Sequence, residues 1–499
     1  MNTPTIVSLL AYFFLMIAIG VYGYFKSTSN VSEYMLGGRK LHPAVVALSA
    51  GASDMSGWML MGLPGAVYLS GLGSAWIAVG LLIGAYWNYL LVAPRLRVYT
   101  EVADDAITIP DYFEKRFQDD SHLLRVFSSL VIVIFFTFYT SAGIVAGGKL
   151  FEASFGLSYQ IGLVITAGAV VSYTMFGGFL AVSLTDFVQG CIMFVALILV
   201  PFVTLQELGG IALASQSLSV LEPNYMSWFS GVTTVGLVSS LSWGLGYFGQ
   251  PHIIVRFMAI RSLGDMSTAR RIGMTWMIIA VFGAVLTGLL GFLYVRQTET
   301  VLDDPETIFI LLSQVLFNPY LSGFLLAAIL AAIMSTISSQ LLVSSSSLTE
   351  DFYKVFLRKE AEQSELVTVG RLSVLGVAIV ATVLALDSDS SILSLVSNAW
   401  AGFGAAFGPV ILLSLFWAGL TRNGALASML SGAITVLFWI YGPFTIADEP
   451  LTATIYEIIP GFIVAAAAAV IVSIFDSAPS TEISERHQHI SSLMAGSRK

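Results

Sequence analysis

The chain has 499 residues, of which 56% are hydrophobic and only 11% are charged, and its mean hydropathy is +0.84. A soluble protein needs a larger polar surface than this, so the composition predicts a polytopic membrane protein. The net charge of -9 argues against a nucleic-acid partner, because phosphate binding needs a basic surface. The single cysteine, Cys191, excludes an intramolecular disulfide.

Thirteen apolar segments are long enough, at roughly 20 residues each, to cross a bilayer as helices. They cover residues 5–25, 42–69, 72–94, 126–148, 159–178, 187–206, 230–249, 272–295, 320–347, 367–386, 391–417, 423–441 and 457–475. The first segment lacks the basic start and the cleavage pattern of a signal peptide, so we expect it to be retained. The sequence therefore predicts an all-α polytopic membrane protein with one transporter-like domain over 1–476 and a short polar cytoplasmic tail over 477–499.

The lysines and arginines predict the orientation, because basic loops stay in the cytoplasm. With thirteen spans, all of the 22 basic residues except Lys149 and Arg296 fall on one side. The sequence thus places the N-terminus outside and the C-terminus in the cytoplasm. The longest cytoplasmic insert, about Arg95 to Arg125, is expected to contain a short amphipathic helix after Pro110.

The spans divide into two blocks of five, a first repeat over about 42–206 and a second over about 230–417. An odd number of spans inverts the second block relative to the first, as in many secondary transporters. Glycine and proline interrupt the leading span of each block, near 52–57 and near 240–251. Three further helices flank the repeats: 5–25, 423–441 and 457–475.

The leading span of the first block carries Asp54, the only charge in a run of about 30 residues. A carboxylate inside a membrane is costly and is expected to be functional. A break at this depth frees backbone carbonyls, which suit a hard cation such as sodium, and exposes a helix N-terminus, which suits a carboxylate. The alternative is a glycine-mediated helix contact in which Asp54 bonds to a neighbouring hydroxyl.

The ninth span presents polar oxygens on one helical face. Ala332, Ser335, Thr336 and Ser339 recur at spacings of three and four residues. These neutral oxygens could complete a sodium site without adding charge. Serine-rich faces are also common at packed helix interfaces, so that alternative stays open.

The seventh span carries an aromatic stripe at its predicted break. Trp243, Tyr247 and Pro251 are spaced by four residues and therefore lie along one face of a helix. Such a stripe is often only core packing, but its position at the break favours a binding site.

Six stretches of the sequence closely resemble bacterial proline-transporting members of the sodium:solute symporter family. They are LGGRKL at 36–41, ALSAGASDMSGWMLMGLPGAVYLSG at 47–71, GGFLAVSLTDFVQ at 177–189, SWGLGYFGQPHIIVRFMA at 242–259, ILAAIMSTISSQLLV at 329–343 and AWAGFGAAFGPV at 399–410. The resemblance extends from about residue 5 to residue 475. It implies a LeuT-type fold of two inverted five-helix repeats with flanking helices.

The resemblance also implies roles for individual residues. Sodium, the coupling ion, would be bound by the carbonyls of Ala52, Met55 and Ala332 and the hydroxyls of Ser335 and Thr336, with Asp54 nearby for high affinity. L-Proline would be enclosed by Ser56, Gly57, Trp58, Tyr139, Trp243, Tyr247 and Pro251. Arg39 and Asp186, at the cytoplasmic ends of spans two and six, match positions tied to coupling and ion release. Ser339 stands where other bacterial relatives carry a cysteine, which is a conservative change.

The resemblance implies sodium-coupled symport of proline across the bacterial cytoplasmic membrane, with no organic cofactor and no obligatory protein partner beyond the lipid bilayer. One alternative is a sodium symporter for another small solute, such as another amino acid or pantothenate. A membrane sensor would need an output module after the last span. An ion channel would conduct sodium without solute. An enzyme is not expected, because no span pairs a nucleophile with a base.

Overall fold

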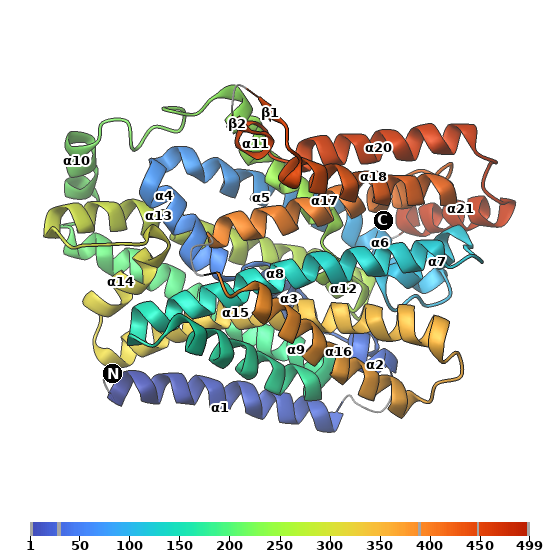
Figure 1. Cartoon of the computed structure of the whole chain (residues 1–499), viewed down its shortest axis with the longest axis horizontal. Coiled ribbons are helices and arrows are strands. Elements are labelled where there is room, and N and C mark those ends of the chain that lie inside the picture. Colours follow the sequence, from blue (N-terminus) through green and yellow to red (C-terminus); the bar gives the residue numbers. More distant parts are fainter. Residues whose placement is uncertain (1–2, 27–30, 388–390, 447–448, 497–499) are drawn as a thin grey trace.

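The computed structural model describes residues 3–26, 31–387, 391–446 and 449–496, and most of its helices run along one long axis (Figure 1). The first helix, α1, begins at the left of this view, and the last, α21, lies at the right. The region predicted as the first repeat contains α3 (Pro43–Asp54), a π-helical turn (Trp58–Gly62), α4 (Leu63–Ser70), a 3-10 turn (Gly71–Ala75), α5 (Trp76–Trp87), a π-helical turn (Asn88–Val92), α6 (Ala93–Val102), α7 (Ile109–Phe117), α8 (Leu123–Phe155) and α9 (Tyr159–Glu207).

The second repeat and the flanking elements complete the fold. The region predicted as the second repeat contains α11 (Thr234–Ser242), a 3-10 turn (Trp243–Gly249), α12 (Pro251–Met258), a 3-10 turn (Leu263–Asp265), α13 (Met266–Thr298), a 3-10 turn (Pro305–Thr307), α14 (Ile308–Val315), α15 (Pro319–Ser346), a π-helical segment (Ser347–Leu357), α16 (Gln363–Leu384) and α17 (Ile392–Phe416). The remaining elements are α1 (Thr3–Lys26), α2 (Val31–Leu36), a 3-10 turn (Gly37–Arg39), α10 (Ile211–Leu221), α18 (Arg422–Tyr441), the antiparallel pair β1 (Thr445–Ile446) and β2 (Glu449–Pro450), α19 (Leu451–Thr454), α20 (Ile458–Phe475) and α21 (Thr481–Gly496). Helix α1 packs against α9 and α15, and α20 packs against α17 and α18.

Both predicted breaks are present. Helix α3 ends at Asp54, Met55 leaves the helical conformation with φ -80° and ψ 76°, and the helix resumes at Trp58. In the second repeat α11 ends before a 3-10 turn, and Gln250 is extended before α12 begins at Pro251. Proline at the first helical position favours such a restart, because proline lacks the backbone N–H that would have no hydrogen-bond partner at that position.

The number of crossings stays a prediction. Within the part of the chain that the structure describes, ten helices are long and apolar enough to cross a membrane by themselves. The broken helices α3 and α12 have only 12 and 8 residues, which is too short to span alone. A count by length alone therefore leaves out any crossing that an interrupted helix would make.

The prediction of two helices in this region, 159–178 and 187–206, agrees with α9, which consists of two helical segments that meet at Gly178, where φ is 60° and ψ is -163°. A Cβ at this residue would lie 2.7 Å from the ring of Tyr34 and 3.0 Å from its carbonyl oxygen. Glycine is therefore required for both the backbone conformation and the close approach, and the second half of α9 begins earlier than predicted.

The insert between Arg95 and Arg125 contains the predicted amphipathic helix, α7. Thr108 caps it by accepting a bond from the amide of Asp111, Pro110 lies in its first turn, and Lys115 and Arg116 lie in its last turn. These features satisfy the free amides and complement the helix dipole.

The C-terminal tail is more ordered than a polar, solvated segment. Helix α21 packs on α6 and buries Ile483, His487 and Ile490, while Arg486 pairs with Asp104 at 3.5 Å. The last three residues of the predicted tail lie outside the described residues. The apolar spacing 483, 487, 490 follows one helical face, which explains the docking.

Acid is expected to weaken the docking of α21. Burial, with Arg116 and Arg95 nearby, lowers the pKa of His487 to about 4. A histidine in a solvated tail has a pKa near 6.5. Between those values the undocked state binds a proton that the docked state excludes, so docking weakens as pH falls from about 6.5 toward 4 and is unaffected above that window.

Spin labels on α21 and α7 would report this change as a longer distance at pH 5.5 than at pH 7.5. His487→Gln, which cannot titrate, is the control and should show the same distance at both pH values. A wild-type distance that does not change with pH would contradict the prediction.

Candidate functional site

Four of the predicted sodium ligands meet where α3 crosses α15. The Ser335 hydroxyl lies 2.7 Å from the carbonyl oxygen of Ala52 and 3.1 Å from that of Ala332. The Thr336 hydroxyl lies 3.4 Å and 3.2 Å from the same two oxygens. Met55, at the end of α3, lies at the break itself. This is a buried cluster of neutral oxygens, the donor chemistry that a monovalent hard cation prefers.

Aromatic side chains converge on the backbone carbonyl of Asp54, which the break leaves outside the helical bonding pattern. The indole nitrogen of Trp58 donates to this oxygen at 3.0 Å, and the Tyr139 hydroxyl lies 3.5 Å from it. The Tyr247 hydroxyl donates to the Asp54 carboxylate. Residues of both repeats thus meet at one point, as the sequence predicted for the two breaks.

We call Trp58, Tyr139, Trp243 and Tyr247 the aromatic cage. Trp243 lies at its edge. Its ring stacks on Tyr456 with centroids 5.2 Å apart, and its carbonyl accepts a bond of 2.8 Å from the indole of Trp400. Trp400 also packs edge-on against Tyr247, with centroids 5.0 Å apart. A cavity of about 540 Å³ between α11, α17 and the segment before α20 reaches Trp243 from the side that carries Lys149.

The remaining predicted cage residues lie at the helix breaks. Ser56 occupies the first break, where its hydroxyl accepts a bond of 3.4 Å from the Trp58 amide. A Cβ on Gly57 would lie 2.7 Å from the Cβ of Ala146, so α3 and α8 approach closely there. Pro251 is buried at the start of α12, and the adjacent His252 ring contacts Tyr139 with centroids 5.9 Å apart.

The carboxylate of Asp54 does not face the cluster of Ser335 and Thr336. Ala52 and Asp54 are two residues apart on α3, about 200° around the helix axis. The Ala52 carbonyl faces α15, whereas the Asp54 side chain reaches Tyr247 and a small cavity bordered by α5, α12 and α13. A direct sodium-ligating role for Asp54 therefore stays a prediction.

Asp186 lies in the protein interior and forms a buried ion pair. Its carboxylate accepts bonds from Arg256 at 3.2 Å and from Ser49 at 2.7 Å, and Ser339 lies 3.4 Å away. Both charged side chains have no exposed surface. The expectation that Asp186 lies at a cytoplasmic helix end is therefore corrected, because the second segment of α9 begins at Gly178 and Asp186 lies inside it, fully buried.

Arg39 joins three separate segments of the chain. Its guanidinium donates to the Asp105 carboxylate at 2.8 Å and to the carbonyl oxygens of Ala106 at 2.6 Å and Met258 at 2.8 Å. Burial lowers the pKa of Arg39, and Asp105 opposes this effect. The bonds hold the start of α3, the loop after α6 and the end of α12 closed against each other.

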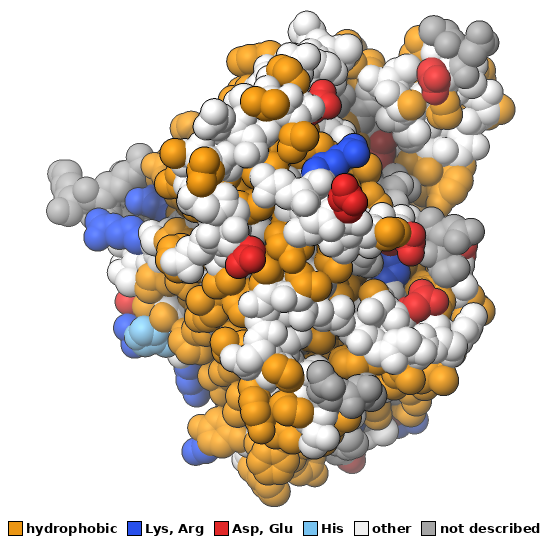
Figure 2. Space-filling model, turned by 90° about the vertical axis from the view of Figure 1, so that its left-hand side faces the viewer, with side chains coloured by type: hydrophobic (Ala, Val, Ile, Leu, Met, Phe, Trp, Pro, Cys, Tyr) orange, Lys and Arg blue, Asp and Glu red, His pale blue; other side chains and the backbone are white. Residues whose placement is uncertain are grey.

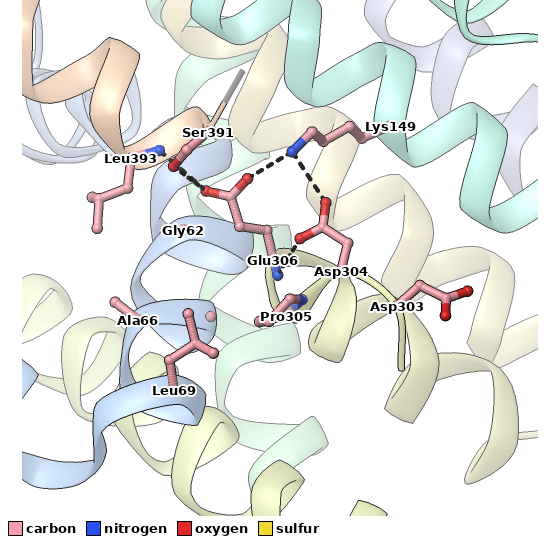
Figure 3. A pocket seen from close by; sticks show the side chains of 11 residues that line it. Gly62, Ala66, Leu69, Lys149, Asp303, Asp304, Pro305, Glu306, Ser391 and Leu393 are labelled. Carbon is pink, nitrogen blue, oxygen red and sulfur yellow. Dashed lines mark hydrogen bonds and ion pairs between the residues drawn. The ribbon is translucent and has the colours of Figure 1, made fainter. Parts of the chain in front are cut away.

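A second ionic network lies at the opposite end (Figure 3). The Lys149 ammonium lies 3.0 Å from both the Asp304 and the Glu306 carboxylates. Glu306 also accepts bonds from the amides of Ile392 at 3.1 Å and Leu393 at 3.2 Å. A carboxylate at a helix N-terminus is favourable, so this loop is clamped to α17 and to α8.

Residues 34–432 match the sodium:solute symporter family. The chain is 57% identical, over 479 residues, to an osmoregulated proline transporter of Bacillus subtilis, covering 96% of each chain. It is 54% identical, over 475 residues, to a sodium/proline symporter of Staphylococcus aureus, covering 95% of this chain and 93% of the relative. The chain belongs to the sodium:solute symporter family. This family protein is a transporter and not an enzyme, as predicted.

The fold is shared with solved transporters. A sodium-coupled sialic acid symporter in a substrate-bound outward-open state superposes with a TM-score of 0.81 at 19% identity, covering 96% of this chain and 99% of the other. A nucleobase-cation-symport-1 family transporter in a closed conformation gives a TM-score of 0.57 at 14% identity, covering 93% and 99%. These matches confirm the predicted LeuT-type fold class of this symporter-family chain.

Several residues around the site escaped the sequence prediction. Trp400 lies in one of the stretches that carry the family resemblance, but its contact with the cage needs the folding of α17 onto α11. Lys149 is one of only two basic residues predicted to lie outside. That exceptional position could have indicated an ion pair with a nearby carboxylate, such as the one with Asp304. Tyr456 gave no signal, because it belongs to a segment between two flanking helices.

Proposed function

We propose that this protein is a sodium/proline symporter that takes up L-proline by alternating access. The observation that carries the proposal is identity of more than half, over nearly the full length, to a proline transporter and a sodium/proline symporter. The aromatic cage beside the neutral-oxygen cluster supports it. The cluster of Ala52, Met55, Ala332, Ser335 and Thr336 would bind sodium.

Proline would lie in the cage between the two breaks. Its carboxylate suits the N-terminal end of the helix that resumes at Gly57 and Trp58, because a helix N-terminus attracts an anion. Its secondary ammonium and compact ring suit the aromatic faces of Tyr139, Trp243 and Tyr247. Another small amino acid or pantothenate would need a different cage, and remains the second candidate solute.

Sodium would favour proline binding by bridging α3 and α15, and proline must raise sodium affinity by the same factor. One sodium ion crossing about 100 mV supplies roughly 2.3 kcal/mol. That corresponds to roughly a fiftyfold proline gradient, to which the sodium concentration gradient adds. Arg39 would lock the cytoplasmic side and Asp186 would assist ion release.

The charges support an N-terminus outside and a C-terminus in the cytoplasm of a bacterial inner membrane. The bonded arginines Arg39, Arg97 and Arg486 gather at the end where α6, α7 and α21 lie. Figure 2 looks onto the other end and shows scattered acidic side chains and a few Lys or Arg side chains among hydrophobic and uncharged ones. The positive-inside rule therefore makes the end in Figure 2 the outer one.

Uptake of labelled proline into proteoliposomes tests the proposal. An inward sodium gradient should drive accumulation above the external concentration, and an equal potassium gradient should not. Excess unlabelled proline should compete, whereas pantothenate and other amino acids should compete weakly. Sodium-independent uptake, or stronger competition by another solute, would refute it.

A further inference from the structure

A cavity of about 470 Å³ lies at the surface of the helix bundle, bordered by α1, α9 and α16. Helix α9 packs against both α1 and α16, which lie beside it in Figure 1. The α1 side of the cavity is apolar and uncovered, because Ile17 and Val21 are each 50% exposed and Phe25 is 80% exposed. Helix α1 is long and apolar enough to cross a membrane, so this surface faces lipid.

One charged side chain borders this apolar cavity. Of the described residues that line it, Arg371 is the only charged one. Arg371 lies roughly 12 Å along the axis of α16 from Gln363, where the helix begins, and α16 is itself a candidate membrane span. A charge on the lipid-facing side of a span is costly, so it is expected to serve a function.

The guanidinium of Arg371 is positioned between α9 and α1. It donates a bond of 3.1 Å to the carbonyl oxygen of Met175, and its central carbon lies 5.6 Å from the centre of the Tyr24 ring. Tyr24 lies close to Lys26, the basic residue that ends α1. Ile17 lies roughly 10 Å away from Tyr24 along α1. The cavity therefore has a basic end and an apolar remainder that follows α1.

We propose that this cavity binds one anionic phospholipid, with its phosphate beside Arg371 and one acyl chain along the α1 side. A basic pocket between membrane helices suits an anionic headgroup, and arginine suits phosphate in particular. The volume falls within the range of about 300–1,000 Å³ that is typical of ligand pockets. The site goes beyond the proposed symport, because it does not depend on which solute is carried.

Tyr173 connects this cavity to the neutral-oxygen cluster. A Cβ added at Gly20 of α1 would lie 3.0 Å from the Cβ of Tyr173, so the two helices approach closely there. The Tyr173 hydroxyl donates a bond of 3.0 Å to the carbonyl oxygen of Met334, which precedes Ser335 on α15. A lipid that fills the cavity therefore supports the packing of α1 on α9 and of α9 on α15.

Native mass spectrometry of the purified full-length protein tests the site. The protein is mixed with equal amounts of phosphatidylglycerol and phosphatidylcholine that carry the same acyl chains. The wild type should retain one phosphatidylglycerol in preference to phosphatidylcholine. Arg371→Gln should lower this preference on the order of tenfold, the effect of losing one bond to a charged group. Arg270→Gln is the matched control, because Arg270 also lies over a tyrosine ring, 6.0 Å from that of Tyr86, but does not line the cavity.

Val21→Trp tests the site without changing its charge. The larger side chain should fill the cavity from α1 and displace the lipid while Arg371 stays in place, so phosphatidylglycerol should raise the thermal unfolding midpoint of the wild type and not of this variant. Glycerol phosphate, which has the headgroup chemistry without the chains, should not displace the lipid from the wild type.

Each of the other outcomes would overturn the proposal. Equal retention of the two lipids by the wild type would indicate unspecific lipid contact, and an equal loss of preference in Arg270→Gln would indicate a general effect of charge. Displacement by glycerol phosphate would indicate a site for free anions. Unchanged retention by Val21→Trp would place the lipid outside the cavity. These measurements do not involve sodium-driven uptake, which tests the proposed function separately.

Discussion

Asp186→Asn is expected to lower the stability of the folded protein strongly. The substitution leaves the Arg256 guanidinium buried, with no exposed surface and no opposite charge. Removing one partner of a buried ion pair costs about 3–5 kcal/mol, because the other charge stays desolvated. The thermal unfolding midpoint of the purified protein should fall clearly, and less folded protein should reach the membrane.

The double substitution Asp186→Asn with Arg256→Gln is the informative comparison. It removes both charges and keeps hydrogen-bonding groups beside Ser49 and Ser339, so it should recover most of the lost stability. Asp265→Asn, which breaks a partly exposed pair with Arg261, should change the midpoint little. Equal midpoints for Asp186→Asn and the double variant would show that the pair does not carry the effect.

Removing the two hydroxyls of α15 is expected to abolish high-affinity sodium coupling without unfolding the protein. Ser335 and Thr336 place their hydroxyls within 3.4 Å of the Ala52 carbonyl. Each bond to a charged group contributes about 1.5–3 kcal/mol, so Ser335→Ala or Thr336→Val should each weaken sodium affinity roughly ten- to hundredfold. The measurement is the sodium concentration for half-maximal proline uptake.

Ser346→Ala is the matched control for these variants. Its hydroxyl bonds to the Leu342 carbonyl within the same helix, so sodium affinity should be unchanged. The double variant Ser335→Ala with Thr336→Val should bind proline weakly at any attainable sodium concentration, because the two sites are coupled. Normal sodium dependence in the double variant would show that these hydroxyls serve only helix packing.

Much of the fold follows from local sequence features. Apolar length predicted the helices, and Gly, Ser and Pro predicted the breaks after Asp54 and before Pro251. The two helices of α9 were predicted, but the start of the second one was placed at residue 187 and not near Gly178, because the uncharged stretch between has no hydropathy signal for a helix start. The docking of α21 was also missed, since its apolar stripe is short and its partner surface on α6 lies far away in sequence.

The candidate site was predictable in part. Helical spacing brought Ser335 and Thr336 onto one face, and the structure adds the Ala52 carbonyl opposite them. Spacing could not predict that Asn88 and Asp54 line one cavity, because this depends on how α3 packs against the π-helical turn after α5. Nor could it pair Asp186 with Arg256, which are 70 residues apart in the chain.

The sequence by itself determined the class of protein, the family, the two interrupted helices and the residue types that suit sodium and proline. These properties depend on composition, periodicity and local backbone preference, which the chain carries everywhere along its length. Only the tertiary structure decided which side of α3 each oxygen faces, which charges are buried as a pair and which helices border each cavity. Those facts depend on contacts between helices distant in sequence, and a rotation of one helix by half a turn would change all of them without changing its hydropathy.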